Sequence, residues 1–165
     1  MRRTYLCTRA MNTDISTWGG ARRQMYNYIL LLVAIVGFIA SYMSYVEYRR
    51  QLRGESGLVC RYDEEGFSKC LVLYMLPQAK FLGKIHFSVL APIYFTVVLA
   101  LVLAFTILGA PKILLLVLLL SGLGVVLVPY LIYLEYIAKA ICIWCTIMHI
   151  SIVANTLMSA ILYFK

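Results

Sequence analysis

Charged residues are scarce in this sequence and almost absent from its longest apolar stretches. They make up 13% of the 165 residues, while hydrophobic residues make up 63%, and the mean hydropathy is +0.88. Soluble domains are only about half apolar, so this composition indicates a protein whose solvent is lipid. Because the apolar stretches carry so little charge, no polar path for a solute is visible, which disfavours a transporter.

Acidic residues are the rarer charge, since 7 Asp and Glu stand against 15 Lys and Arg and the net charge is +8. The basic residues lie at the ends of apolar runs and in one connecting segment, which is how membrane proteins set their orientation. This pattern disfavours a nucleic-acid-binding protein. A cleavable signal peptide is also disfavoured, because no small-residue cleavage site follows the first apolar run and that run is too long.

Four apolar runs stand out, at about residues 28–46, 87–108, 113–133 and 140–163. Each is long enough to cross a hydrocarbon core of about 30 Å as an α-helix. The length of the chain allows a single domain. We therefore predict an all-α fold, an integral membrane four-helix bundle over residues 27–165 with one substantial extracytosolic loop at about residues 47–86. We expect a tight hairpin at residues 109–112 and a short polar connector at residues 135–139.

The orientation in the membrane depends on the charges around the first run. Residues 1–26 are expected to form a loosely structured cytoplasmic arm. With the N-terminus inside, seven Lys and Arg would lie on the cytoplasmic side and eight outside, which is nearly balanced. The arginines of the arm lie close to the first span, which dominates insertion, and so favour this orientation. We expect a multi-pass protein of the cell membrane with both termini cytoplasmic.

The five cysteines are Cys7, Cys60, Cys70, Cys142 and Cys145. With four spans, the loop that holds the second and third cysteines falls on the same side of the membrane as the start of the last helix. Four of the five cysteines are thus expected to share the extracytosolic face. Cys7 is expected on the other face, as a bystander.

Cys142 and Cys145 form a CxxC motif at the expected first turn of the last helix. Unpaired backbone N–H groups and the helix dipole favour negative charge there, so the thiolate of the leading cysteine is stabilised. The spacing brings both sulfurs to one face, where they can form an easily exchanged disulfide. A metal site is the alternative, but Cys60 and Cys70 lack the tight spacing of a zinc knuckle. A redox role is favoured over a metal site or a pair of small core residues.

Cys60 and Cys70 lie ten positions apart in a polar, charged loop, where a disulfide is geometrically easy. One interpretation is a static staple of the loop. The other is a relay, because thiol–disulfide exchange requires only that a loop thiolate reach the CxxC disulfide. A relay needs an acceptor for two electrons, and inside a membrane the available carrier of that kind is a quinone.

The order of these parts resembles the vitamin K epoxide reductase family, in its prokaryotic disulfide-forming branch. That family has four spans, a spaced cysteine pair in the first extracytosolic loop and a CxxC that opens the last helix. Its members also commonly run Cys-x12-Gly-x10-Tyr, which Cys70, Gly83 and Tyr94 match. The other quinone-dependent bacterial disulfide-forming family has its CxxC first, so the order disfavours it.

The resemblance implies an electron relay. Cys60 and Cys70 would exchange with a thioredoxin-like extracytosolic thiol protein, with Cys60 facing that partner. Cys70 would then attack Cys142, and Cys145 would face a quinone of the ubiquinone or menaquinone type and deliver electrons to it. No metal is implied. His149, one helical turn after Cys145, is a candidate for bonding a quinone carbonyl or helping protonation, or else for bonding a backbone carbonyl.

The positions expected near the quinone are His149, Leu76, Phe81 and Tyr94. At Leu76 the family usually has Ser or Thr, and further departures are Ile85 in place of proline and Leu90 in place of glycine. These departures point away from epoxide reduction and leave quinone reduction intact. We therefore predict an oxidoreductase that generates disulfides. The alternatives are a vitamin K epoxide or quinone reductase proper, and a non-enzymatic membrane protein with structural disulfides.

Overall fold

The computed structural model describes the backbone of residues 4–55, 80–81, 85–138 and 142–164, and side chains in residues 24–55, 86–138 and 142–164. Its elements are α1 (Thr4–Leu52), β1 (Lys80–Phe81), β2 (Ile85–His86), α3 (Phe87–Leu108), α4 (Pro111–Ala138) and α5 (Ile143–Phe164). Each of the four helices contains a stretch long and apolar enough to cross a membrane. The two strands form a short antiparallel pair in which Lys80 lies opposite His86. The predicted all-α membrane bundle is confirmed.

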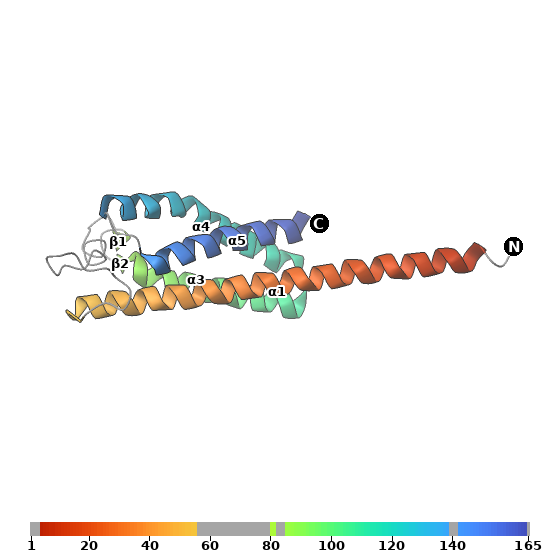
Figure 1. Ribbon diagram of the computed structural model, residues 1–165, viewed down its shortest axis with the longest axis horizontal. Helices are drawn as coiled ribbons and strands as arrows, with labels where there is room; N and C mark the ends of the chain where they lie inside the picture. Colours follow the sequence, from red (N-terminus) through yellow and green to blue (C-terminus); the bar gives the residue numbers. More distant parts are fainter. Residues whose placement is uncertain (1–3, 56–79, 82–84, 139–141, 165) are drawn as a thin grey trace.

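Each helix of the bundle packs against two others. α1 packs against α3 and α5, and α4 packs against the same two helices. Figure 1 shows that α1 ends, α3 begins, α4 ends and α5 begins at one end of the bundle, which we call the loop end. At the opposite end, the hairpin end, α3 turns into α4, and the N-terminal part of α1 extends beyond it (Figure 1). The CxxC motif therefore lies at the loop end.

Local signals explain where α3 and α4 begin and end. His86 caps α3, because its ring nitrogen Nδ1 accepts a hydrogen bond from the Ser88 backbone N–H at 3.1 Å. α3 stops at Gly109, which has a φ of 63° and donates its N–H to the Phe105 carbonyl at 2.8 Å. α4 starts with Pro111, whose missing N–H costs nothing in a first helical turn.

Small residues allow the helices to approach one another closely. The buried face of α1 follows a spacing of three and four residues and includes Leu30, Ala34, Gly37, Ser41 and Ser44. A Cβ atom on Gly37 would overlap the ring of Phe95 on α3. Without a hydrophobic force between helices in lipid, such close packing is what holds membrane bundles together.

The outer surface of the bundle is apolar. Large side chains on it are well exposed, and examples are Leu32 on α1, Ile107 on α3, Leu123 and Val126 on α4, and Ile150 on α5. In water such a surface would drive aggregation, whereas a lipid bilayer solvates it. The exposed apolar surface and the four apolar helices together identify a multi-pass membrane protein.

Three boundaries differ from the sequence predictions. The helix α1 continues back to Thr4, so residues 4–26 are helical and not the loose arm we expected; no proline occurs before Leu52 to break the helix. α1 also runs past residue 46 to Leu52, and the Glu47 side chain on this added stretch is only 1% exposed. Likewise α4 continues through Ala138, so Glu135 belongs to a helix and not to a connector.

Candidate functional site

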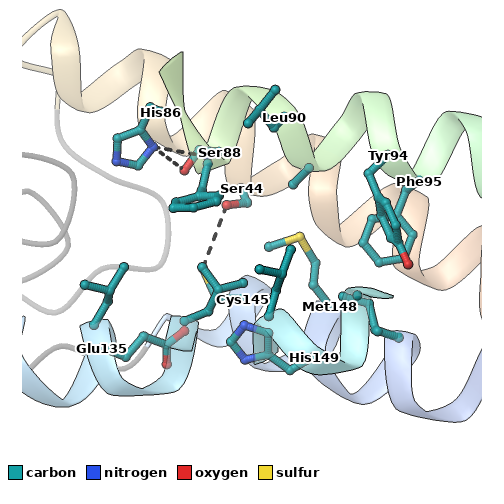
Figure 2. Close-up of a pocket in the computed structure, with 17 residues that line it drawn as sticks. Ser44, His86, Ser88, Leu90, Tyr94, Phe95, Glu135, Cys145, Met148 and His149 are labelled. Carbon is teal, nitrogen blue, oxygen red and sulfur yellow. Dashed lines mark hydrogen bonds between the residues drawn. The ribbon is translucent and has the colours of Figure 1, made fainter. Parts of the chain in front are cut away.

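A cavity of about 250 Å³ lies between the helices near the loop end (Figure 2). All four helices contribute to it, together with the residue before α3. Its lining residues are Ser44, His86, Phe87, Ser88, Leu90, Ala91, Tyr94, Phe95, Gly124, Leu127, Leu131, Leu134, Glu135, Cys145, Met148, His149 and Ile152. Most of these side chains are apolar, and the few polar ones are Ser44, His86, Ser88, Tyr94, Glu135 and His149 besides the cysteine thiol. Such walls suit an apolar ligand oriented by a few polar groups.

The CxxC motif lies where α5 begins. The carbonyl of Cys142 accepts hydrogen bonds from the Thr146 N–H at 3.0 Å and the Thr146 hydroxyl at 3.1 Å, so Cys142 immediately precedes the first helical turn. Cys142 is only 3% exposed and packs with Leu134 and Ala138 of α4. Cys145, one turn further, lines the cavity. Of the two sulfurs, Cys145 is therefore the one that a ligand in the cavity would meet.

Both residues of the motif are thiols in this structure, and their side chains interact through a hydrogen bond. The two sulfurs therefore lie on the same side of the helix, close to each other, as the CxxC spacing predicts. The Cys145 sulfur also lies 3.9 Å from the hydroxyl oxygen of Ser44 on α1 (Figure 2). A hydroxyl in this place can donate to a thiolate, which favours the reactive form of the cysteine.

His149 and Tyr94, both predicted from the sequence as ligand contacts, line the same cavity as Cys145. His149 is 8% exposed and lies one turn after Cys145 on α5. The Tyr94 hydroxyl donates to the Leu120 carbonyl of α4 at 3.4 Å. It fits there because position 124 is glycine, where a Cβ atom would lie 2.6 Å from the tyrosine oxygen. The structure thus brings these predicted residues together around one space.

The remaining predicted site residues are not placed. Cys60, Cys70 and Leu76 lie outside the described residues, as does the predicted connector's end at residue 139. Phe81 is described only in its backbone, as the end of β1. The roles assigned to these four residues stay predictions.

Ser44 and Glu135, two polar residues that line the cavity with Cys145, were not predicted from the sequence. Ser44 lies inside the first apolar run, where a serine attracts no notice; its inward direction follows from the three- and four-residue spacing of α1. Glu135 was assigned to a polar connector, although it is a lone carboxylate between apolar residues. A lone carboxylate in an otherwise apolar stretch, seven residues before the CxxC motif, was the signal that could have found it.

Comparison with known proteins agrees with this arrangement. Residues 28–160 match the model of the vitamin K epoxide reductase family. No curated protein and no solved structure matches the chain. The matched range begins within α1 and extends through all four membrane helices, including the CxxC motif and every described residue that lines the cavity. Members of this family are membrane oxidoreductases. The chain belongs to the vitamin K epoxide reductase family.

Proposed function

We propose that this protein is a membrane thiol oxidoreductase that generates disulfide bonds in extracytosolic proteins and passes the electrons to a quinone. One observation carries this proposal: the Cys145 thiol of a helix-start CxxC lines an apolar cavity between membrane helices. A merely structural cysteine pair needs no such cavity. A pair that passes electrons to an apolar acceptor needs one, because the acceptor must reach a sulfur from within the lipid.

Cys60 and Cys70 start the electron path in this proposal. Their disulfide accepts two electrons from a thioredoxin-like thiol protein. The loop pair becomes two thiols, and the two thiols of the partner become a disulfide. A Cys70 thiolate then attacks Cys142, the Cys142–Cys145 disulfide breaks, and Cys145 leaves as a thiolate. A Cys60 thiolate resolves the mixed disulfide, so the loop pair is oxidised again and the CxxC holds two thiols.

Reoxidation of the CxxC takes place at the cavity. Two S–H bonds break, one S–S bond forms, and two electrons and two protons leave with the acceptor. A quinone supplies this chemistry when bound, because it takes up two electrons and two protons together. Its ring would be held by the apolar walls, with His149 and Tyr94 available to its carbonyl oxygens. The cavity of about 250 Å³ is slightly smaller than typical small-molecule pockets, which begin at about 300 Å³.

The test uses the purified full chain in detergent, a reduced thioredoxin-like protein and a soluble ubiquinone or menaquinone analogue, with quinone absorbance followed over time. We expect the native chain to reduce the quinone and Cys145→Ala to lose the activity. Cys60→Ala should lose activity with the protein substrate but keep it with a small dithiol that reduces the CxxC directly. Cys7→Ala is the matched control, because that cysteine lies outside the proposed relay.

Two results would overturn the proposal. Equal quinone reduction by the native chain and Cys145→Ala would show that the CxxC does not carry the electrons. Protection of the CxxC thiols from alkylation under every redox condition would indicate structural cysteines instead. Turnover of a vitamin K epoxide in the same assay would favour the epoxide-reducing alternative.

A further inference from the structure

Glu135 is the one carboxylate among the described residues that line the cavity. It lies one turn before the end of α4 and is partly buried. An ionisable side chain within a membrane-spanning helix is costly and is usually retained for a function. Nothing assigned to the site so far uses it.

Glu135 lies in the neighbourhood of the CxxC motif. It interacts electrostatically with Cys142 and with Cys145. Leu134 and Ala138, its neighbours on the same face of α4, pack directly against Cys142. Figure 2 shows the Glu135 carboxylate directed into the cavity, beside Cys145 and His149.

A simpler interpretation is that Glu135 marks the end of the helix, with its carboxylate turned toward water. The exposures of its neighbours speak against this. Tyr136 is 80% exposed and Ile137 is 49% exposed, so the outer face of α4 passes through these residues, while Glu135 faces the cavity. A carboxylate that only needed solvent would be better placed on the outer face.

We propose that Glu135 is the proton acceptor for the CxxC thiols, an inference that rests on the proposed function. When the S–S bond forms, two thiol protons must leave, and water is scarce in an apolar cavity. The Glu135 carboxylate takes the proton of the Cys142 thiol as the Cys142 sulfur bonds to the Cys145 sulfur. It then releases that proton to the reduced acceptor. The other proton leaves Cys145 directly for the acceptor. Two electrons and two protons are thereby transferred, and Glu135 ends as a carboxylate again.

Other titratable groups also line the cavity around Glu135. Cys142, Cys145 and His149 face it from α5, and His86 and Tyr94 line the cavity from the side of α3. From α1 only Ser44 lines the cavity among the described residues. Glu135 alone of these groups combines a carboxylate with an interaction to both sulfurs, which makes it the acceptor.

The test compares the native chain with Glu135→Gln, which is nearly isosteric but cannot accept a proton. The first readout needs no quinone: alkylation of the reduced CxxC by iodoacetamide, followed by peptide mass spectrometry from pH 6 to 10. Removing a negative charge beside the sulfurs favours the thiolate, so Glu135→Gln should be alkylated several-fold faster at neutral pH. The second readout is quinone reduction, which should fall by about 100-fold, the lower range for loss of a general base.

The pH profile of quinone reduction separates proton transfer from a structural role. In Glu135→Gln the thiols must lose protons directly to solvent, so turnover should rise about tenfold per pH unit below the range where the thiols titrate. The native chain should show a much flatter profile. Glu135→Asp should recover part of the rate and the flat profile. Glu55→Gln is the matched control, because Glu55 is an exposed carboxylate beyond α1, 3.9 Å from Arg53, and should change nothing.

Each outcome decides one question. A native chain that does not reduce quinone refutes the proposed function and this inference with it. A native chain that is active, with Glu135→Gln equal to it in rate and pH profile, overturns the inference alone. If Glu135→Gln does not fold, Glu135→Asp decides, and a steep pH profile in that variant would overturn the role of the carboxylate.

Discussion

Gly124 and Gly122 lie two residues apart on α4, and the same substitution at each should have opposite effects. At Gly124, a Cβ atom would lie 2.6 Å from the Tyr94 hydroxyl oxygen and 3.0 Å from the Ile152 Cγ2 atom. At Gly122, a Cβ atom would have no neighbour within 4 Å. Both alanines gain the same helix propensity, so their difference measures the crowding at the cavity wall.

The difference in stability between the two variants can be worked out from these distances. In Gly124→Ala the tyrosine oxygen must retreat by roughly 0.8 Å to restore ordinary van der Waals contact, which strains its bond to the Leu120 carbonyl. Overpacking of this kind costs about 1–3 kcal/mol. The propensity gain of up to about 1 kcal/mol cancels between the two variants. We therefore expect Gly124→Ala to be less stable than Gly122→Ala by about 1–3 kcal/mol.

The assay is reversible unfolding in mixed micelles, with SDS as the denaturant and circular dichroism as the signal. Because Tyr94 lines the cavity, Gly124→Ala should also raise the KM for the quinone analogue more than it lowers kcat. Gly122→Ala should leave both constants unchanged. Equal stability of the two alanine variants would refute the reasoning, since it would mean that the helices do not approach as closely at Gly124 as the structure has it.

Three further predictions concern single polar contacts. His86→Ala should destabilise the protein by about 1 kcal/mol relative to His86→Asn, because asparagine can still accept from the Ser88 N–H at the start of α3. Ser44→Ala should slow alkylation of Cys145 at neutral pH by about fivefold, since the 3.9 Å contact is a long hydrogen bond worth roughly 1 kcal/mol. Asn155→Leu should be neutral or stabilising by about 1 kcal/mol, because the Asn155 amide is 1% exposed and has no hydrogen-bond partner among the described residues.

Each of these three predictions can be contradicted by a measurement. Thermal unfolding that does not distinguish His86→Ala from His86→Asn would show that the cap contributes nothing. Ser41→Ala is the control for Ser44, because Ser41 is equally buried but bonds the Phe38 carbonyl within α1 and should leave the alkylation rate unchanged. A loss of more than 1 kcal/mol in SDS unfolding of Asn155→Leu would indicate that the amide has a buried partner, such as a water molecule.

Much of the fold follows from the chain's apolar runs. Backbone groups in lipid must bond within their own segment, so a charge-free run of about twenty residues has few options other than a helix. The ends of the runs were harder to predict. Glu47 and Glu135 look like the ends of spans in the sequence, yet both belong to helices. Glu47 is buried inside the bundle and Glu135 lines the cavity.

The candidate site, too, was predicted from the sequence only in part. Alternation of four spans predicts that the start of the last helix shares a membrane face with the long loop. The expectation that the CxxC and the loop pair lie on one face therefore comes from counting spans. Tyr94 and His149 were named from residue type and from the family's spacing. That they line one cavity with Cys145 depends on the packing of α3, α4 and α5, which no spacing in one segment encodes.

The sequence by itself determined the four membrane helices, the family and the CxxC motif at the start of the last helix, because each depends on local composition or spacing along one segment. Only the tertiary structure decided which groups surround that pair. Ser44 lies 3.9 Å from the Cys145 sulfur although 101 positions of chain separate them, and Glu135 lines the same cavity from a neighbouring helix. Small residues such as Gly37 and Gly124 let neighbouring helices pack closely, because each leaves room for an aromatic side chain, Phe95 and Tyr94 respectively.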